Sequence, residues 1–326
     1  MSEVIHQALA GAARSALRAP SVLNTQPWKW RLEGEALELH ADRSRQLTSI
    51  DPHGKLLLLS CGIALHHARL ALAFTGHTPH VQRVVTTFAD DLIARITVEG
   101  PHRPTAKDRA LQRATWTRRT DRRPFSDRSV PRDTVRLLQD AAAREGALAH
   151  RVRLDQMPML AIAADQASSR EMADPQYRIE LMRWLNRPEW SGDGVPATTA
   201  VAQVPRRVPV RPLVLDPNDG TAIDPGGDLG AAYLIVYGEG DRPLDWLVAG
   251  EASSAVLLTA TSLGLGIAPM SDVIEVAHSR ELLAGMLPGA GHPYLALRCG
   301  WQDSSDHVDQ SPRRPAGEAI VGLGDE

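Results

Sequence analysis

The start of the chain changes from a helical to a strand-like pattern of apolar residues. Up to Leu17, apolar side chains recur close to a helical period, at Val4, Ile5, Ala8, Leu9 and Ala12. Pro20 cannot continue this helix, because it lacks a backbone N–H and its ring clashes with the preceding turn. Apolar and polar residues then alternate from Trp28 to Leu32, which is typical of a strand. The pattern predicts a helix, a turn over residues 18–28 and a strand.

Two long apolar segments, residues 57–74 and 249–263, repeat the same pattern in different parts of the chain. Both are rich in small residues, and both are followed by glycine, as helix C-termini prefer. Gly62 in the first and Gly250 in the second are offset by 188 residues, and so are the glycines that follow the segments. The repeat predicts two related halves, each with a helix that can approach a neighbour closely. Two unrelated alanine-rich helices are the alternative.

Shorter elements accompany these two helices. A helix is expected over residues 131–145, because apolar side chains share one face and glycine follows it. Strands are expected over residues 81–87, 92–98, 149–154 and 294–299. The elements therefore follow a similar order in the two parts of the chain.

The turn after the first helix bunches short polar side chains. Ser21, Asn24 and Gln26 lie close together there, among backbone amides that we expect to be free. Such a turn can hydrogen-bond a polyhydroxylated or phosphorylated ligand. A cap and turn that satisfy only their own groups are the alternative.

A second polar segment, residues 118–125, reads Arg-Arg-Thr-Asp-Arg-Arg-Pro-Phe. Arginine offers a rigid and permanently charged fork that suits phosphate and similar anionic groups. The segment is therefore a candidate anion site. A solvated basic patch is the alternative.

Both polar segments resemble signatures of the nitroreductase family. Pro-Ser-x-x-Asn-x-Gln-Pro-Trp at residues 20–28 resembles the flavin-binding turn of that family. Residues 118–122 resemble its Arg-x-Ser/Thr-x-Arg/Lys-x-Phe signature, although Phe125 lies one place later than the signature expects. The family comprises FMN-dependent oxidoreductases, usually homodimers with FMN in the subunit interface. The resemblance implies an α+β, nitroreductase-like fold.

The two halves keep different signatures. The first half has the polar turn but no arginine-rich segment at its start, and the second half has the reverse. This arrangement resembles the Acg-type branch of the family and implies two fused halves, residues 1–105 and 106–326. They would form a pseudo-dimer around the two long helices, with one flavin site retained. The Pro/Gly-rich residues 186–230 correspond to the variable insertion of the family and are expected to form a lid. We expect a monomer, with a homodimer as the alternative.

The resemblance also implies which residues hold FMN. Arg118 would meet the phosphate, with Arg313 and Arg314 as partners, although a solvated C-terminal tail is the alternative. Thr120 would bind the ribityl or phosphate region. Arg122 would lie at flavin N1/O2, where a cation stabilises the reduced ring. Residues of the turn in the first half would reach across to the same cofactor.

Residues 269–272 match the family loop beside the isoalloxazine ring. A backbone N–H of Ser271 or Asp272 would point at flavin N5, and Asp272 is also a candidate N-cap for a following helix. The full cofactor-binding set implied by the resemblance is Pro20, Ser21, Val22, Asn24, Gln26, Arg118, Arg119, Thr120, Arg122, Pro269, Met270, Ser271, Asp272, Arg313 and Arg314.

The implied activity is NAD(P)H-dependent reduction of a nitro, quinone or related small-molecule acceptor through FMN. No catalytic side chain is expected, because the cofactor carries the chemistry. Two alternatives stay open: an FMN-sequestering protein without reductase activity, and a flavin-dependent dehydrogenase acting on a biosynthetic intermediate. The sequence leaves open the acceptor, the choice between NADH and NADPH, and whether the lid admits a substrate.

Composition narrows the remaining classes. The 326 residues carry a net charge of −3, which gives no reason to expect nucleic-acid binding. His66 and His67 are adjacent and do not face one another on a helix, so we expect packed or surface histidines and no metal site. No leader is evident and no segment reaches the length of an apolar membrane span, which predicts a cytoplasmic protein away from membranes. Two cysteines, Cys61 and Cys299, make no disulfide framework.

Overall fold

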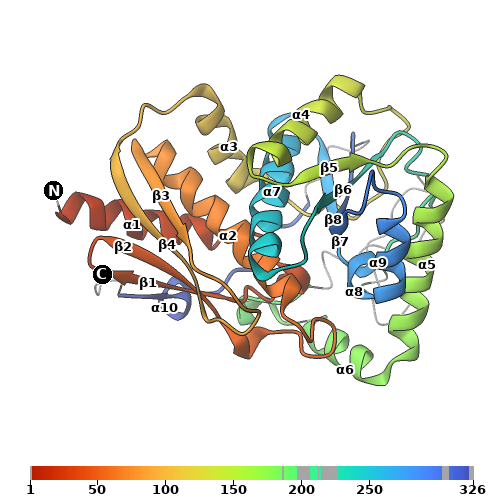
Figure 1. Cartoon of the computed structure of the whole chain (residues 1–326), viewed down its shortest axis with the longest axis horizontal. Helices are drawn as coiled ribbons and strands as arrows, with labels where there is room; N and C mark the ends of the chain where they lie inside the picture. The colour runs from red at the N-terminus through yellow and green to blue at the C-terminus, as the bar shows by residue number, and fades with distance from the viewer. Residues whose placement is uncertain are drawn as a thin grey trace.

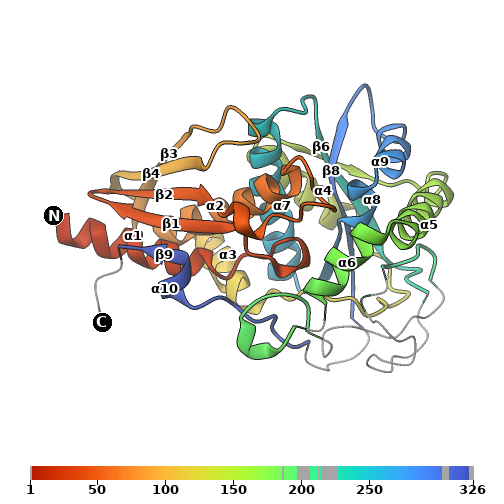
Figure 2. The same ribbon diagram turned by 90° about the horizontal axis from the view of Figure 1, so that it is seen from below.

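The fold combines helices with two separate β-sheets, as the α+β prediction requires (Figure 1). The computed structural model describes residues 2–185, 187–196, 206–211, 213, 227–302 and 308–322. Within these residues the first sheet has the strand order β3-β4-β2-β1-β9 and the second has the order β5-β6-β8-β7. Two long helices, α2 and α7, lie between the sheets (Figures 1 and 2).

The first sheet is built mainly from the first hundred residues. The chain forms α1 (Ser2–Ala16), a short 3-10 turn η1 (Val22–Asn24), β1 (Trp28–Glu33), β2 (Ala36–Ala41), η2 (Arg43–Arg45), α2 (Lys55–Phe74), β3 (His77–Arg83) and β4 (Leu92–Pro101). Buried and exposed residues alternate strictly along β1, because one face of the sheet packs into the core. Trp28 and Trp30 are fully buried on that face.

The second sheet takes its strands from the later part of the chain. After α3 (Ala106–Thr117) come α4 (Arg132–Arg144), β5 (Leu148–Arg151), α5 (Met157–Ala173), α6 (Pro175–Trp184) and η3 (Glu189–Ser191). After these the structure has β6 (Ala232–Gly238), α7 (Pro243–Ser262), β7 (Gly266–Met270), α8 (Asp272–Glu275), α9 (Ala277–Ala284) and β8 (His292–Gly300). In β6 and β8 almost every residue is buried, since these central strands are covered on both faces.

The C-terminal segment returns to the first sheet. It forms α10 (Ala316–Ala319) and β9 (Ile320–Val321), and β9 pairs in parallel with β1, with Trp30 opposite Ile320 (Figure 2). The last described residues therefore lie against the first half, although the sequence division at residue 105 assigns them to the second. This return carries the segment around Arg313 past the turn between α1 and β1.

Helices α2 and α7 approach each other most closely at a pair of glycines. A Cβ atom on Gly62 would lie 2.0 Å from the carbonyl oxygen of Leu247, and a Cβ on Gly250 would lie 2.0 Å from that of Leu59. The two contacts are equivalent, and one step further His66 Nδ1 lies 2.8 Å from Ser254 Oγ, again 188 residues away. The two helices are thus related by a local pseudo-two-fold axis. The close approach expected from the small residues is present.

Other elements differ from the sequence-based ranges. The first strand after α2 begins at His77 instead of residue 81, because Gly76 adopts a left-handed conformation (φ 89°) and turns the chain directly into β3. The helix after Met270 begins at Asp272, so Ser271 takes the N-cap position that we expected for Asp272. The helices α3, α5 and α6 were not foreseen.

Helix α2 also corrects the expectation that no segment could span a membrane. Residues Lys55–Phe74 are long and apolar enough by length and composition. Most of the helix is buried inside the protein, where its apolar residues join one continuous core with both sheets. The apolar character of α2 is therefore explained by its place as a core helix.

Candidate functional site

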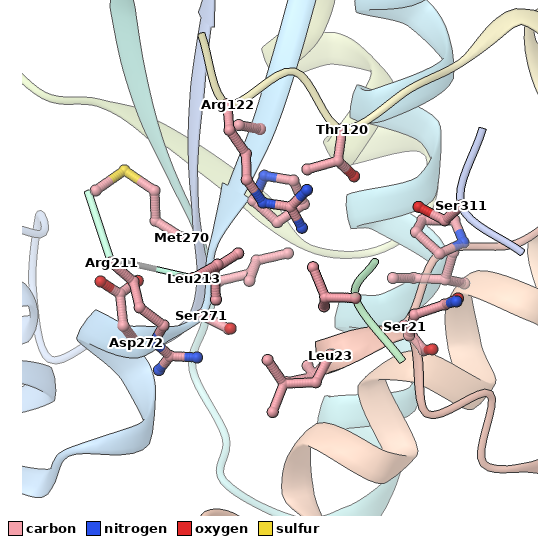
Figure 3. Close-up of a pocket in the computed structure, with 18 of the residues that line it drawn as sticks. Ser21, Leu23, Thr120, Arg122, Arg211, Leu213, Met270, Ser271, Asp272 and Ser311 are labelled. Atoms are coloured by element: carbon pink, nitrogen blue, oxygen red, sulfur yellow. The ribbon is translucent and has the colours of Figure 1, made fainter. Parts of the chain in front are cut away.

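A pocket lies between the two halves, against the N-terminal half of α2. It encloses about 1040 Å³ of space between protein atoms, including its open mouth, a size typical of small-molecule sites. Thr120 and Arg122 lie on one side, Ser271 and Asp272 on another, and Ser21 and Ser311 on a third (Figure 3). Twelve of the predicted site residues line it: Pro20, Ser21, Val22, Asn24, Arg118, Thr120, Arg122, Pro269, Met270, Ser271, Asp272 and Arg313.

The turn between α1 and β1 is held in an unusual backbone conformation. Leu23, Asn24 and Gln26 all have positive φ angles, of 48°, 54° and 49°. Such conformations cost about 1–3 kcal/mol each and persist at sites where the surroundings enforce them. The backbone amides that we expected to be free are used inside the protein: Gln26 N–H donates to Ser21 Oγ at 2.8 Å, and Val22 N–H to Ser60 Oγ at 3.4 Å. The turn therefore contributes shape and side chains to the pocket more than it contributes amides.

Asn24 joins the turn to two distant segments. Its Nδ2 donates to the carbonyl oxygens of Gly194 and Pro312, both at 3.0 Å. Its Oδ1 accepts from Arg313 Nη1 at 3.2 Å. Since both donors and the acceptor are engaged, Asn24 acts by holding Arg313 at the pocket.

Arg118 and Arg313 form what we call the cationic corner of the pocket. Arg118 follows α3 and is 6% exposed, while Arg313 comes from the C-terminal return and is half-buried. Within the described residues neither forms an ion pair with a carboxylate, and the buried Nε atom of each has no hydrogen-bond partner. Arg118 Nη1 donates to Thr120 Oγ1 at 3.3 Å. Buried N–H groups are almost always satisfied in folded proteins, so the corner is suited to an anionic ligand.

The electrostatics of the corner support the same conclusion. Burial and the neighbouring Arg119 and Arg122 together lower the pKa of Arg118 to about 10. Burial and the nearby Arg118 and Arg18 lower the pKa of Arg313 to about 9. Both side chains remain cationic at neutral pH but are electrostatically strained. A bound anion relieves this strain because it replaces repulsion with attraction.

Arg298 of β8 is fully buried and holds the arginine-rich segment in place. Arg298 forms an ion pair with Asp228 at 2.6 Å and donates to the carbonyl oxygens of Asp121 and Arg123, both at 2.9 Å. These contacts hold the backbone on both sides of Arg122. The side chain of Arg122 therefore projects into the pocket from a rigid support (Figure 3).

The opposite wall is formed by the end of β7 and the start of α8. Asp272 is 5% exposed there. Burial raises the pKa of its carboxyl to about 7, and Glu171 and Glu275 raise it while Arg211 lowers it. Arg211 comes from the region expected to form a lid and bonds to Glu171 at 2.5 Å and also to Glu275.

The expected lid lies partly outside the described residues. Of residues 186–230, the structure describes 187–196, 206–211, 213 and 227–230. The described members Val195, Val210, Arg211 and Leu213 all line the pocket. This part of the insertion therefore forms one wall of the site.

Three predicted residues do not line the pocket: Gln26, Arg119 and Arg314. Gln26 is fully buried, and its side chain donates to Gly192 O and accepts from Arg314 N–H. Arg314 donates to the carbonyl oxygens of Gln26 and Trp28, because it anchors the C-terminal return to β1. Arg119 donates to carbonyl oxygens at the end of α3. These residues fix the walls of the site from outside.

Sequence reasoning missed pocket residues that carry no local motif. Leu59 and Ile63 line the pocket from α2, one helical turn apart, and read in sequence as ordinary core positions. Arg211 and Arg298 also line it. Their carboxylate partners lie far along the chain, so no sequence spacing indicates these pairs. Arg298 could have been singled out, because it is an arginine within an otherwise apolar strand.

The pseudo-two-fold axis places a different residue at the related position of α7. Glu251 stands 188 residues after Ile63 and is fully buried. It forms ion pairs with Arg69 and Arg83, each at 2.7 Å. A buried salt bridge in α7 thus replaces the apolar residue that lines the pocket from α2.

No protein-family model matches the chain. A Mycobacterium tuberculosis protein named "Putative NAD(P)H nitroreductase Rv3131" is 40% identical over 313 residues, covering 94% of this chain and 88% of the relative. "Putative NAD(P)H nitroreductase acg" from the same organism is 31% identical, covering 95% and 94%. A crystal structure of a nitroreductase with bound FMN from Bacteroides fragilis matches 66% of this chain and 98% of its own, with 13% identity and a TM-score of 0.41.

The fold and the pocket define an α+β protein with a pocket of small-molecule size between its two halves, lined on one side by arginines. The chain belongs to the NAD(P)H nitroreductase family, and its relatives include the Acg-type protein. The resemblance drawn from the two sequence signatures is confirmed. Because nitroreductases are oxidoreductases, membership places the chain in that class of enzymes.

Proposed function

We propose that the chain is an FMN-dependent NAD(P)H oxidoreductase that reduces a nitro, quinone or related small-molecule acceptor. The observation that carries this proposal is the cationic corner, where the buried Arg118 and the half-buried Arg313 lie at the pocket without a carboxylate partner among the described residues. Guanidinium groups bind phosphate oxygens through strong, charge-assisted and often bidentate hydrogen bonds. The residues present therefore fit the phosphate end of FMN.

The remaining walls suit the rest of such a cofactor. Thr120 offers a hydroxyl beside the corner, and Arg122 offers a cation on the same side of the pocket. Leu59 and Ile63 supply an apolar wall from α2, and the segment Pro269–Asp272 lies opposite. Bound FMN supplies hydride transfer, and the chain supplies binding, orientation and exclusion of water. We assign no catalytic acid or nucleophile.

The first test is a titration of the purified chain with FMN, followed by flavin fluorescence. We expect binding of one FMN per chain. Arg118→Ala should weaken it about ten- to a hundredfold, because a hydrogen bond to a charged group contributes about 1.5–3 kcal/mol. Arg113→Ala is the matched control, since Arg113 is exposed on α3, the helix that Arg118 follows, and lies outside the pocket. Absence of FMN binding by the wild type would refute the proposal.

A second candidate is FMN sequestration without reduction, favoured by the described insertion residues that form one wall of the pocket. Anaerobic mixing of the FMN-loaded chain with NADH or NADPH separates the two. Rapid bleaching of the flavin absorbance supports the oxidoreductase. Bleaching by dithionite alone supports sequestration, and turnover of a reduced biosynthetic intermediate into its oxidised form would indicate a dehydrogenase.

We further propose that the chain acts as a cytoplasmic monomer. The continuous core through both halves, and the contact between α2 and α7, bury inside one chain a surface of the kind that two subunits would share. NAD(P)H, the proposed electron donor, is also a cytoplasmic metabolite. Sedimentation at micromolar concentration tests the monomer, and a tight dimer that loses FMN on dissociation would contradict it.

A further inference from the structure

His67 is a buried side chain that the proposed function does not use. It lies in α2 and is fully buried. Neither ring nitrogen has a hydrogen-bond partner among the described residues. Its neighbour His66 differs, because His66 Nδ1 lies 2.8 Å from Ser254 Oγ of α7. Two unsatisfied nitrogens on one buried ring are costly, so a partner from outside the protein is expected.

The register of α2 places His67 one turn beyond two residues that line the pocket, although His67 itself is enclosed behind the lining. Residues four apart share one face of a helix, and Leu59 and Ile63 both line the pocket. His67 is the next residue on that face. The charged groups that act on its ring are Arg118 and Arg313 of the cationic corner, together with His66. The imidazole therefore adjoins the corner where the Nε atoms of both arginines also lack partners.

We propose that the His67 imidazole is a third donor to the anionic group that the cationic corner binds, and that it lets the site distinguish a phosphorylated flavin from an unphosphorylated one. This inference rests on the proposed function. A neutral imidazole carries one N–H donor, which it can give to a phosphate oxygen. Burial and the two arginines lower the pKa of His67 well below 6.5, which keeps the ring neutral.

The second half of the chain is consistent with this assignment. The residue of α7 that stands 188 positions after His67 is Ala255. Of the two central helices, α2 alone carries an imidazole at this position. If His67 only filled space beside α2, an apolar side chain would serve equally well, and the difference between His67 and Ala255 would have no explanation.

The test compares FMN with riboflavin, which lacks the phosphate. For the wild type, His67→Leu and His67→Gln, dissociation constants for both ligands are measured by fluorescence titration. We expect His67→Leu to weaken FMN binding about ten- to a hundredfold, the change expected for a hydrogen bond to a charged group, and to leave riboflavin binding unchanged. His67→Gln retains an N–H donor and should recover part of the affinity for FMN. His66→Leu is the matched control and should leave the ratio of the two constants unchanged.

The outcomes are separable. Equal loss of both ligands in His67→Leu, or no change in the ratio, would overturn the inference while leaving the proposed function intact. Absence of FMN binding by the wild type would refute the proposed function itself. Should the variants fail to fold, ¹⁵N NMR of histidine-labelled wild type replaces them. A ring nitrogen without a partner should shift on adding FMN but not riboflavin, and no FMN-specific shift would overturn the inference.

Discussion

The contact between α2 and α7 gives the sharpest prediction, in the substitution Gly62→Ala. The added Cβ would lie 2.0 Å from the carbonyl oxygen of Leu247 and 2.9 Å from Gly250 Cα. Both obstacles are backbone atoms, so no side chain can rotate away, and the helices must move apart. Overpacking of this kind costs about 1–3 kcal/mol, and a backbone clash belongs at the upper end of that range.

The same substitution also brings a gain that must be subtracted. Alanine favours a helix over glycine by about 1 kcal/mol. We therefore expect Gly62→Ala to lower the free energy of unfolding by about 2 kcal/mol. Gly11→Ala in α1 is the matched control, because Gly11 is exposed and a Cβ there meets nothing within 4 Å. That control should raise stability by up to about 1 kcal/mol.

Urea denaturation of both variants, followed by circular dichroism, measures the difference. We expect the two variants to differ by about 3 kcal/mol in opposite directions from the wild type. Gly250→Ala should behave like Gly62→Ala, because its Cβ would lie at the same 2.0 Å from Leu59 O. Equal stability of Gly62→Ala and Gly11→Ala would refute the close contact and the pseudo-two-fold axis with it.

Three further predictions concern single buried polar side chains. Glu251→Ala should lower stability by about 2 kcal/mol, because it removes the charge-assisted hydrogen bonds that Arg69 and Arg83 donate to the buried carboxylate. The exposed Glu35→Ala is the control, and equal effects of the two variants in denaturation would contradict this. The folded state raises the pKa of Asp272 from 3.8 to about 7, so it binds a proton that the unfolded state releases, and stability falls as pH rises through that interval. Asp272→Asn should therefore be progressively more stable than the wild type from pH 4 to pH 8, and a constant difference would show an ordinary carboxyl. Asn24→Ala should weaken FMN binding, because Arg313 loses the hydrogen bond that it donates to Asn24 Oδ1. An unchanged dissociation constant in the fluorescence titration would show that this hydrogen bond is not needed to place Arg313.

The elements that sequence predicted best are those whose signal is local. The glycine pair Gly62 and Gly250 followed from a fixed offset, and β1 followed from strict alternation. The arginine-rich segment and the polar turn were recognisable because their residues stand at fixed spacing. In each case the chemistry lies within a few residues of the chain, which is the range over which a pattern carries information.

What sequence did not reveal depends on partners far along the chain. Arg298 is separated by 70 residues from Asp228, and Arg211 by 40 from Glu171. Asn24 was expected at the ligand, but its amide is engaged by Gly194 and Pro312, 170 and 288 residues away. No spacing rule connects such positions. Only the fold shows that Asn24 contacts Arg313 and that Arg298 holds the backbone on both sides of Arg122.

The pseudo-symmetry relates two positions on the central helices that differ in their chemistry. The two central helices contact each other through equivalent backbone atoms, so corresponding positions of α2 and α7 have the same backbone surroundings in this contact. The difference lies in single side chains: Ile63 leaves an apolar wall in α2, whereas Glu251 brings a charge that Arg69 and Arg83 neutralise. A buried carboxylate with two partners cannot move aside without a large desolvation cost. Glu251 and its two arginines therefore occupy the position in α7 that corresponds to the apolar wall of the pocket in α2, and the pocket takes its arginines from one half and its turn from the other.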